Sequence, residues 1–148
     1  MKILIQCFSD INLIFKLLIL ILFLPFVVLG QGSLTNISFY SNSLSMNRNV
    51  QVYLPEEYNP QDSKRYPVVY FLHGAWGNYT SNPELIGILD NLIGDSTISP
   101  VIVVKPDGSY GPWAGSMYTN SELYGNFEDY IVYDLVEFID TTYKTTFS

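Results

Sequence analysis

Two short glycine-containing segments hold the residues best suited to nucleophilic chemistry. Residues 73–77 (HGAWG) include the only histidine among the 148 residues. Residues 107–111 (DGSYG) place Ser109 in a pattern close to G-x-S-x-G, in which a nucleophilic serine stands on a sharp turn between two glycines. A serine activated by a histidine can attack a carbonyl carbon. Covalent catalysis through serine is therefore the first chemistry to consider.

Neither available serine fits that pattern well. At Ser109 the first glycine of the motif is replaced by Asp107, and a proline and a tryptophan follow where a helix should begin. Ser116 lacks both flanking glycines. We therefore interpret both serines as poor nucleophile candidates.

Two other candidates have simpler explanations. Cys7 is the only cysteine and precedes the main apolar run, so no thiolate or disulfide chemistry is expected in the remainder. Glu128 and Asp129 resemble a catalytic carboxylate pair, but they lie in the first turn of a predicted helix. Acidic side chains there interact favourably with the helix dipole, and we prefer that role.

Two apolar runs must position the glycine segments. Residues 67–72 (PVVYFL) and 100–104 (PVIVV) are continuous and rich in β-branched side chains, as expected for strands buried on both faces. The first ends at His73, and the second ends in a turn at residues 105–108. In sheets of this kind ligands bind at the carboxyl ends of the strands, where both segments would lie.

The flanking elements predict an α/β fold. Residues 34–54 alternate apolar and polar and indicate a hairpin with a turn at residues 45–48. Residues 82–92 predict a helix capped by Asn82, and apolar residues spaced by three and four predict another over residues 126–143. The order of elements favours a mixed, mostly parallel sheet with a leading β-hairpin.

Four segments together resemble the putative esterase family, which is similar to esterase D, feruloyl and acetyl-xylan esterases and mycolyltransferase-like enzymes. They are residues 48–58 (RNVQVYLPEEY), 66–78 (YPVVYFLHGAWGN), 100–108 (PVIVVKPDG) and 126–140 (NFEDYIVYDLVEFID). The resemblance extends over residues 35–145. It implies the N-terminal half of an α/β-hydrolase fold.

The resemblance assigns a role to the backbone of Ala75. In the family, the residue after the strand-ending glycine donates its N–H to the oxyanion formed during acyl transfer. Gly74 and Trp76 would shape the turn and contact substrate. An ordinary strand-to-helix loop without a ligand remains the alternative.

The resemblance also implies that the catalytic triad lies outside this sequence. In α/β-hydrolases the triad residues follow the order serine, acid, histidine. His73 precedes the other candidates, so we expect it to hold the loop by a hydrogen bond. The nucleophile should follow on the strand after the helix that ends near Tyr143.

Residues 109–125 form a long segment rich in aromatic and amide side chains, which suits a phenolic or carbohydrate ester. Packing of these rings onto the sheet is an equal alternative. The implied function is an exported serine esterase acting on feruloyl or acetyl esters of carbohydrate. Acyl transfer to a sugar, or an inactive or carbohydrate-binding fragment, are the alternatives. No metal or other cofactor is implied, and the residues expected to bind substrate are Gly74, Trp76, Trp113, Tyr118 and Asn120.

The N-terminal segment has the features of a signal peptide. Residues 17–29 are apolar and uncharged, follow Lys2 and Lys16, and are too few for a comfortable membrane span. We predict a signal peptide over residues 1–30 with cleavage after Gly30, and a truncated esterase domain over residues 31–148. An uncleaved anchor is the alternative. Cleavage would give a secreted or periplasmic protein with no stable membrane partner.

The net charge of −7 disfavours two classes of partner. Nucleic acids and anionic membranes both require basic surfaces. The expected partner is a small-molecule or polysaccharide ester.

Overall fold

The computed structural model describes residues 30–111 and 115–146, and the predicted signal peptide lies outside them apart from Gly30. A long antiparallel hairpin opens the fold, formed by β1 (Ser33–Ser41) and β2 (Met46–Leu54). Its turn covers residues 42–45, so the prediction of a turn at 45–48 was wrong. Strand pairing continues to Met46, and Ser45 closes the turn with a φ of 53°.

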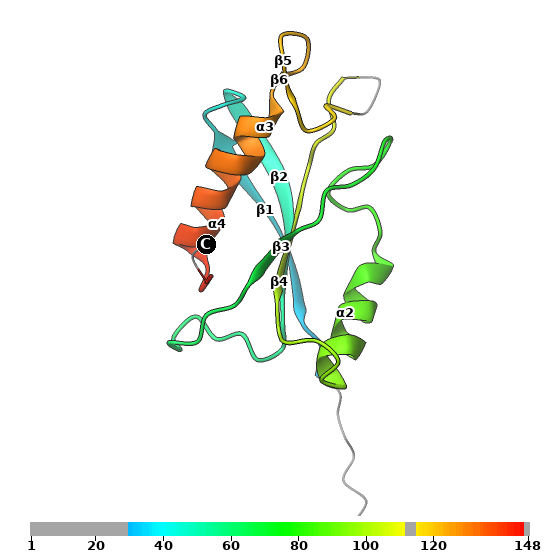
Figure 1. Ribbon diagram of the computed structural model, residues 1–148, viewed down its shortest axis with the longest axis vertical. Helices are drawn as coiled ribbons and strands as arrows, with labels where there is room; N and C mark the ends of the chain where they lie inside the picture. The colour runs from blue at the N-terminus through cyan, green and yellow to red at the C-terminus, as the bar shows by residue number, and fades with distance from the viewer. Residues whose placement is uncertain (1–29, 112–114, 147–148) are drawn as a thin grey trace, which may run out of the picture.

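The hairpin joins a mixed four-stranded sheet in the order β1-β2-β4-β3 (Figure 1). Strand β4 (Ile102–Pro106) is buried throughout, and it pairs antiparallel with β2 and parallel with β3 (Val68–Tyr70). The mixed sheet with its leading hairpin is confirmed. In the part of the chain that the structure describes, β3 and β4 are the one pair of strands that run parallel.

Strand β3 differs from its prediction as a strand buried on both faces. It has only three residues, and Val69 is 49% exposed. The reason is its place at the edge of the sheet, where part of its surface is uncovered. Just before β3, Tyr66 forms a parallel bridge with Thr145: the Tyr66 N–H donates to the Lys144 carbonyl at 2.8 Å, and the Thr146 N–H donates to the Tyr66 carbonyl at 2.9 Å. The segment after the last helix thus starts to run along the outer edge of β3.

Helices cover both faces of the sheet and give three layers (Figure 1). On one face lies α2 (Glu84–Gly94), whose Leu89 packs with Tyr53, Val101 and Val103. On the other face one helical segment comprises α3 (Phe127–Asp129), a π-helix (Tyr130–Leu135) and α4 (Val136–Thr142). The larger apolar core lies under this segment and includes Phe39, Val50, Val52, Ile102, Val104, Phe127, Tyr130, Leu135 and Ile139.

Both helices depart from their predictions in detail. Asn82 does not cap α2: it has a φ of 57°, and its side chain donates to Glu84 Oε1, so the N-cap is Pro83 and the helix begins one residue later than predicted. In the C-terminal segment Tyr130 is fully buried, whereas Thr142 at the end of α4 is exposed. The π-helix changes the spacing of the inward-facing side chains, because its hydrogen bonds span five residues instead of four.

No helix within residues 30–111 or 115–146 is both long and apolar enough to cross a lipid bilayer.

Candidate functional site

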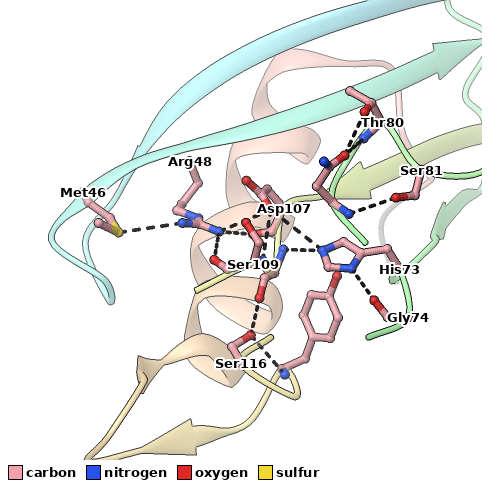
Figure 2. Close-up of polar contacts among 12 residues, drawn as sticks. Met46, Arg48, His73, Gly74, Thr80, Ser81, Asp107, Ser109 and Ser116 are labelled. Atoms are coloured by element: carbon pink, nitrogen blue, oxygen red, sulfur yellow. Dashed lines mark hydrogen bonds and ion pairs between the residues drawn. The ribbon is translucent and has the colours of Figure 1, made fainter. Parts of the chain in front are cut away.

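His73 ties the carboxyl ends of β3 and β4 together (Figure 2). The Gly108 N–H donates to His73 Nε2 at 3.0 Å, and His73 Nδ1 lies 2.9 Å from the Gly74 carbonyl. Because Nε2 accepts a hydrogen bond, the ring proton must be on Nδ1, which donates to Gly74. Both nitrogens of the neutral ring are thus engaged with backbone. The expectation that His73 holds the loop is confirmed, and neither nitrogen is free to act as a base.

Gly108 connects this histidine to the next loop. Its carbonyl accepts hydrogen bonds from the Ser116 hydroxyl at 2.8 Å and the Ser116 N–H at 3.1 Å. A Cβ atom at Gly108 would lie 2.4 Å from the Tyr118 ring, so only glycine allows this approach. The buried Ser116 hydroxyl therefore has a structural partner, in agreement with its rejection as a nucleophile.

A buried arginine that the sequence analysis did not single out fixes the end of β4. Arg48 Nη2 donates to the carbonyls of Asp107 at 2.5 Å and Ser109 at 2.9 Å, and lies 3.6 Å from Asp107 Oδ1 (Figure 2). The guanidinium also stacks over the Phe127 ring, with its carbon 5.3 Å from the ring centroid. One signal in the sequence could have indicated this role. Arg48 alternates with Val50 and Val52 and so shares their buried face.

These ties shape a cavity of about 490 Å³ at the carboxyl end of the sheet. Ala75 lines this cavity, and within the described part of the chain its N–H has no hydrogen-bond partner. The backbone at Trp76, Met117 and Tyr118 has positive φ values of 67°, 55° and 51°. Such conformations are costly for residues other than glycine and occur often at functional sites. The lining residues include His73, Gly74, Ala75, Trp76, Met117, Tyr118 and Tyr124.

The cavity has a largely apolar wall with few ionisable groups. Burial raises the pKa of Tyr118 to about 12, so its phenol is neutral at physiological pH. The residues that the structure describes contain no cluster of three potential metal ligands. The arrangement can bind an apolar ligand and offer a backbone N–H to an electron-rich oxygen.

The structure brings together four of the six residues assigned from the sequence to the site. Gly74, Ala75, Trp76 and Tyr118 all line the cavity. Asn120 does not line it, because its side chain is used at the start of α3: Oδ1 accepts the N–H groups of Glu128 at 3.1 Å and Asp129 at 3.2 Å.

The remaining assignments concern Trp113 and the acidic pair. Trp113 lies outside the described residues. Glu128 and Asp129 occupy the first turn of α3, as predicted for partners of the helix dipole. Asp129 Oδ1 also accepts a hydrogen bond from Asn120 Nδ2 at 2.9 Å.

Comparisons with known proteins agree with this geometry. Residues 41–148 match the model of a family described as "Putative esterase". The chain is 32% identical over 127 residues to an endo-1,4-beta-xylanase/feruloyl esterase of Xylanibacter ruminicola, a match covering 79% of this chain and 17% of that protein. It is 27% identical over 108 residues to an esterase of Mycobacterium tuberculosis, covering 72% of this chain and 23% of that one.

Solved structures share the fold. A ferulic acid esterase superposes with a TM-score of 0.69 at 22% identity, over 78% of this chain and 45% of that one. The feruloyl esterase module from Clostridium thermocellum, solved with sinapinate, gives a TM-score of 0.64 at 24% identity, over 82% of this chain and 41% of that one. The chain has the α/β-hydrolase fold and spans less than half of these solved chains.

Proposed function

Because the chain belongs to the putative esterase family, we propose that this protein hydrolyses carboxylic esters through an acyl-serine intermediate. The observation that carries the proposal is that Ala75 lines the cavity and that its N–H has no partner in the described residues. An ester carbonyl placed against this N–H would gain a hydrogen bond as its oxygen becomes negative.

The proposed chemistry has two steps. A general base takes the proton of the serine hydroxyl as the serine oxygen bonds to the carbonyl carbon, and the carbonyl oxygen becomes an oxyanion that accepts a hydrogen bond from the Ala75 N–H. Cleavage of the ester C–O bond then releases the alcohol, which takes that proton back from the base. Water attacks the acyl-serine in the second step, releasing the carboxylic acid and restoring the serine hydroxyl.

We propose that the nucleophile follows Thr146. The bridge between Tyr66 and Thr145 begins a parallel pairing along the outer edge of β3. If a strand continues in that register, its residue about eight positions beyond Thr146 reaches the level of Ala75, because paired parallel strands advance together at about 3.3 Å per residue. A serine at this level would lie beside the Ala75 N–H.

The substrate we propose is a feruloyl or acetyl ester on plant polysaccharide. A relative is named an endo-1,4-beta-xylanase/feruloyl esterase, and the largely apolar cavity suits an aromatic acyl group. We further propose that residues 1–30 are a signal peptide removed after Gly30, which would bring the enzyme to an extracellular or periplasmic polysaccharide. N-terminal sequencing of the mature protein tests the cleavage.

Removal of one backbone donor tests the proposed function. Feruloyl, acetyl and thioester substrates are assayed with the full-length protein, its Ala75→Pro variant and its Ala75→Gly variant. Proline lacks the N–H, so kcat should fall roughly 10²–10³-fold, whereas glycine keeps the donor and most of the activity. Thermal unfolding of both variants checks that the fold persists. If the 148 residues alone hydrolysed an ester and acylated Ser109 or Ser116, the proposal would be overturned.

A further inference from the structure

A second cavity of about 380 Å³ adjoins the candidate active site. Its walls are the turn between β1 and β2, the side chain of Tyr110 and residues 122–127. Tyr124 lines both cavities, so a long ligand could occupy the two at once. The volume lies within the range of about 300–1,000 Å³ that is usual for ligand-binding cavities.

The walls of this cavity are held in place by contacts that its lining residues and their neighbours make. Asp134 Oδ2 accepts hydrogen bonds from the Ser41 hydroxyl at 2.5 Å and the Ser43 N–H at 2.8 Å, which anchor the hairpin turn to the helical layer. On the opposite wall the Tyr110 ring packs edge-on against Tyr124 and Phe127, with centroids 5.8 and 6.0 Å apart. The cavity is therefore largely preformed.

The lining combines aromatic surface with free hydrogen-bonding groups. Tyr110 remains 40% exposed. Glu122 is exposed, and within the described residues its carboxylate has no hydrogen-bond or ion-pair partner. Ser43 and Asn126 add further polar groups to the wall.

The charge of the lining restricts the ligand. Glu122 is the one ionisable acid or base among the lining residues apart from the tyrosine phenols, and the lining contains no lysine, arginine or histidine. An anionic ligand would find no counter-charge and would be repelled by Glu122. A single carboxylate is also too few ligands for a tightly held metal ion. A cationic ligand would gain little, because an ion pair with a single exposed carboxylate is weak. The lining therefore favours a neutral molecule with hydroxyl donors and an apolar face.

We infer that this second cavity binds neutral sugar residues of the polysaccharide that carries the ester. The Glu122 carboxylate accepts hydrogen bonds from sugar hydroxyls, and the C–H face of a sugar ring packs against Tyr110. This inference rests on the proposed function, because it extends the binding surface of the same site through Tyr124.

The test compares two esters of one acid, methyl ferulate and a feruloylated neutral xylo-oligosaccharide, on the full-length protein. The readout is the ratio of kcat/KM for the sugar ester to kcat/KM for the methyl ester. We expect Glu122→Ala to lower this ratio roughly tenfold through KM of the sugar ester, as loss of a charged hydrogen bond predicts. Glu137→Ala is the matched control, because it removes an exposed carboxylate from α4 and should keep the wild-type ratio.

A binding measurement complements the kinetics. Titration with an unesterified neutral xylo-oligosaccharide should give saturable binding that Glu122→Ala weakens, and an oligosaccharide of uronic acids of equal length should bind at least tenfold more weakly. An unchanged kinetic ratio in Glu122→Ala, or equal binding of the acidic sugar, would overturn the inference while leaving the esterase proposal intact. If neither ester were hydrolysed, the proposed function itself would fail.

Discussion

Arg48 lies where β2, the end of β4 and the helical layer meet. A buried charge is tolerated only when it is paired and hydrogen-bonded. Here one guanidinium nitrogen binds two carbonyls and faces the Asp107 carboxylate, and the plane stacks over two aromatic rings. These contacts fix the backbone on both sides of Gly108, which in turn binds His73 and the loop that bears Ala75. Arg48 is thus a positioning residue for the candidate site.

Replacement of Arg48 should loosen the His73 tie as well as the fold. In Arg48→Met, Asp107 loses its counter-charge and two carbonyls lose their donor. The free energy of unfolding should therefore fall by about 3–5 kcal/mol. With Gly108 less fixed, the His73 ring should populate both neutral tautomers instead of one. Denaturant titration measures the first effect. The ¹⁵N chemical shifts of the single imidazole in this chain measure the second.

Arg48→Lys is the matched variant for this experiment. Lysine keeps the positive charge near Asp107 but lacks the planar fork that reaches two carbonyls at once. Compared with Arg48→Met, this variant should regain part of the lost stability. The His73 ring should still populate both neutral tautomers. If imidazole shifts were the same in wild type and Arg48→Met, Arg48 would not act through His73.

At the residue scale, the roles that could be predicted are those set by residues close together in the sequence. The turn around Ala75 and the role of His73 follow from a short glycine motif at the end of an apolar run. Arg48 was missed because its carbonyl partners are 59 and 61 positions away. Asn120 was assigned to substrate because its sequence context is aromatic, whereas its amide caps the helix that begins seven residues later.

At the scale of elements, the sequence predicted whether each segment is a helix or a strand. It predicted less well how deeply each element is buried. The apolar runs became strands and the periodic segments became helices. The exposure of Val69 depends on which strand lies next to β3, and that pairing is not encoded in β3 itself. The π-helix likewise escaped prediction, because an α-helical period was assumed over residues 126–143. The observed geometry instead turns Tyr130 inward beneath Arg48.

A polar ladder across three strands leads to a prediction about the sheet. Lys105 Nζ donates to Gln51 Oε1 at 2.9 Å, and Gln51 Nε2 donates to Asn36 Oδ1 at 3.0 Å. Lys105 is only 2% exposed, and burial lowers the pKa of its amine. The double variant Lys105→Met with Gln51→Leu removes both buried polar groups. It should raise the free energy of unfolding by about 1–4 kcal/mol, as replacement of other buried polar pairs by apolar residues has done.

The single variants complete a double-mutant cycle for this ladder. Lys105→Met alone leaves Gln51 Oε1 buried without its donor, which should offset most of the gain. Chemical denaturation of the four proteins near neutral pH provides the measurement. A double variant less stable than wild type would mean that the ladder contributes net stability to the sheet.

At the scale of the whole molecule, the three layers place Gly74, Ala75, Trp76 and Tyr118 at one end. Because β3 and β4 are parallel and β2 runs against them, the ends of β3 and β4 and the start of β2 converge. Alternation of strands and helices in the sequence was sufficient to predict this convergence. The cavities themselves could not be predicted, because their walls combine residues 73–76, the hairpin turn and the described parts of residues 108–127, which lie far apart in the sequence.

Tyrosines packed on both faces of the sheet make the stability of the whole fold sensitive to alkaline pH. Burial raises the pKa of Tyr130 and Tyr53, and raises that of Tyr70 to about 12, above the ordinary tyrosine value of about 10. The hydrogen bond that Tyr53 donates to Asp90 Oδ1 at 2.8 Å adds to its shift. In the unfolded chain these phenols lose their protons near pH 10, while the folded protein retains them. Stability should therefore be unaffected below about pH 9 and fall as pH rises through 10, by about 1.4 kcal/mol per pH unit for each tyrosine.

Denaturant unfolding from about pH 8 to about pH 11 tests this sensitivity. Tyr70→Phe removes one of the phenols with a raised pKa, so the alkaline slope of this variant should be smaller than that of wild type by about 1.4 kcal/mol per pH unit. Tyr40, which is 57% exposed on β1, offers the matched control, since Tyr40→Phe removes a phenol from the surface. Because the shifted tyrosines line both faces of the sheet, the loss should appear as one cooperative transition. A free energy of unfolding that stays constant across this range would show that the phenols ionise as readily in the folded protein as in the unfolded chain.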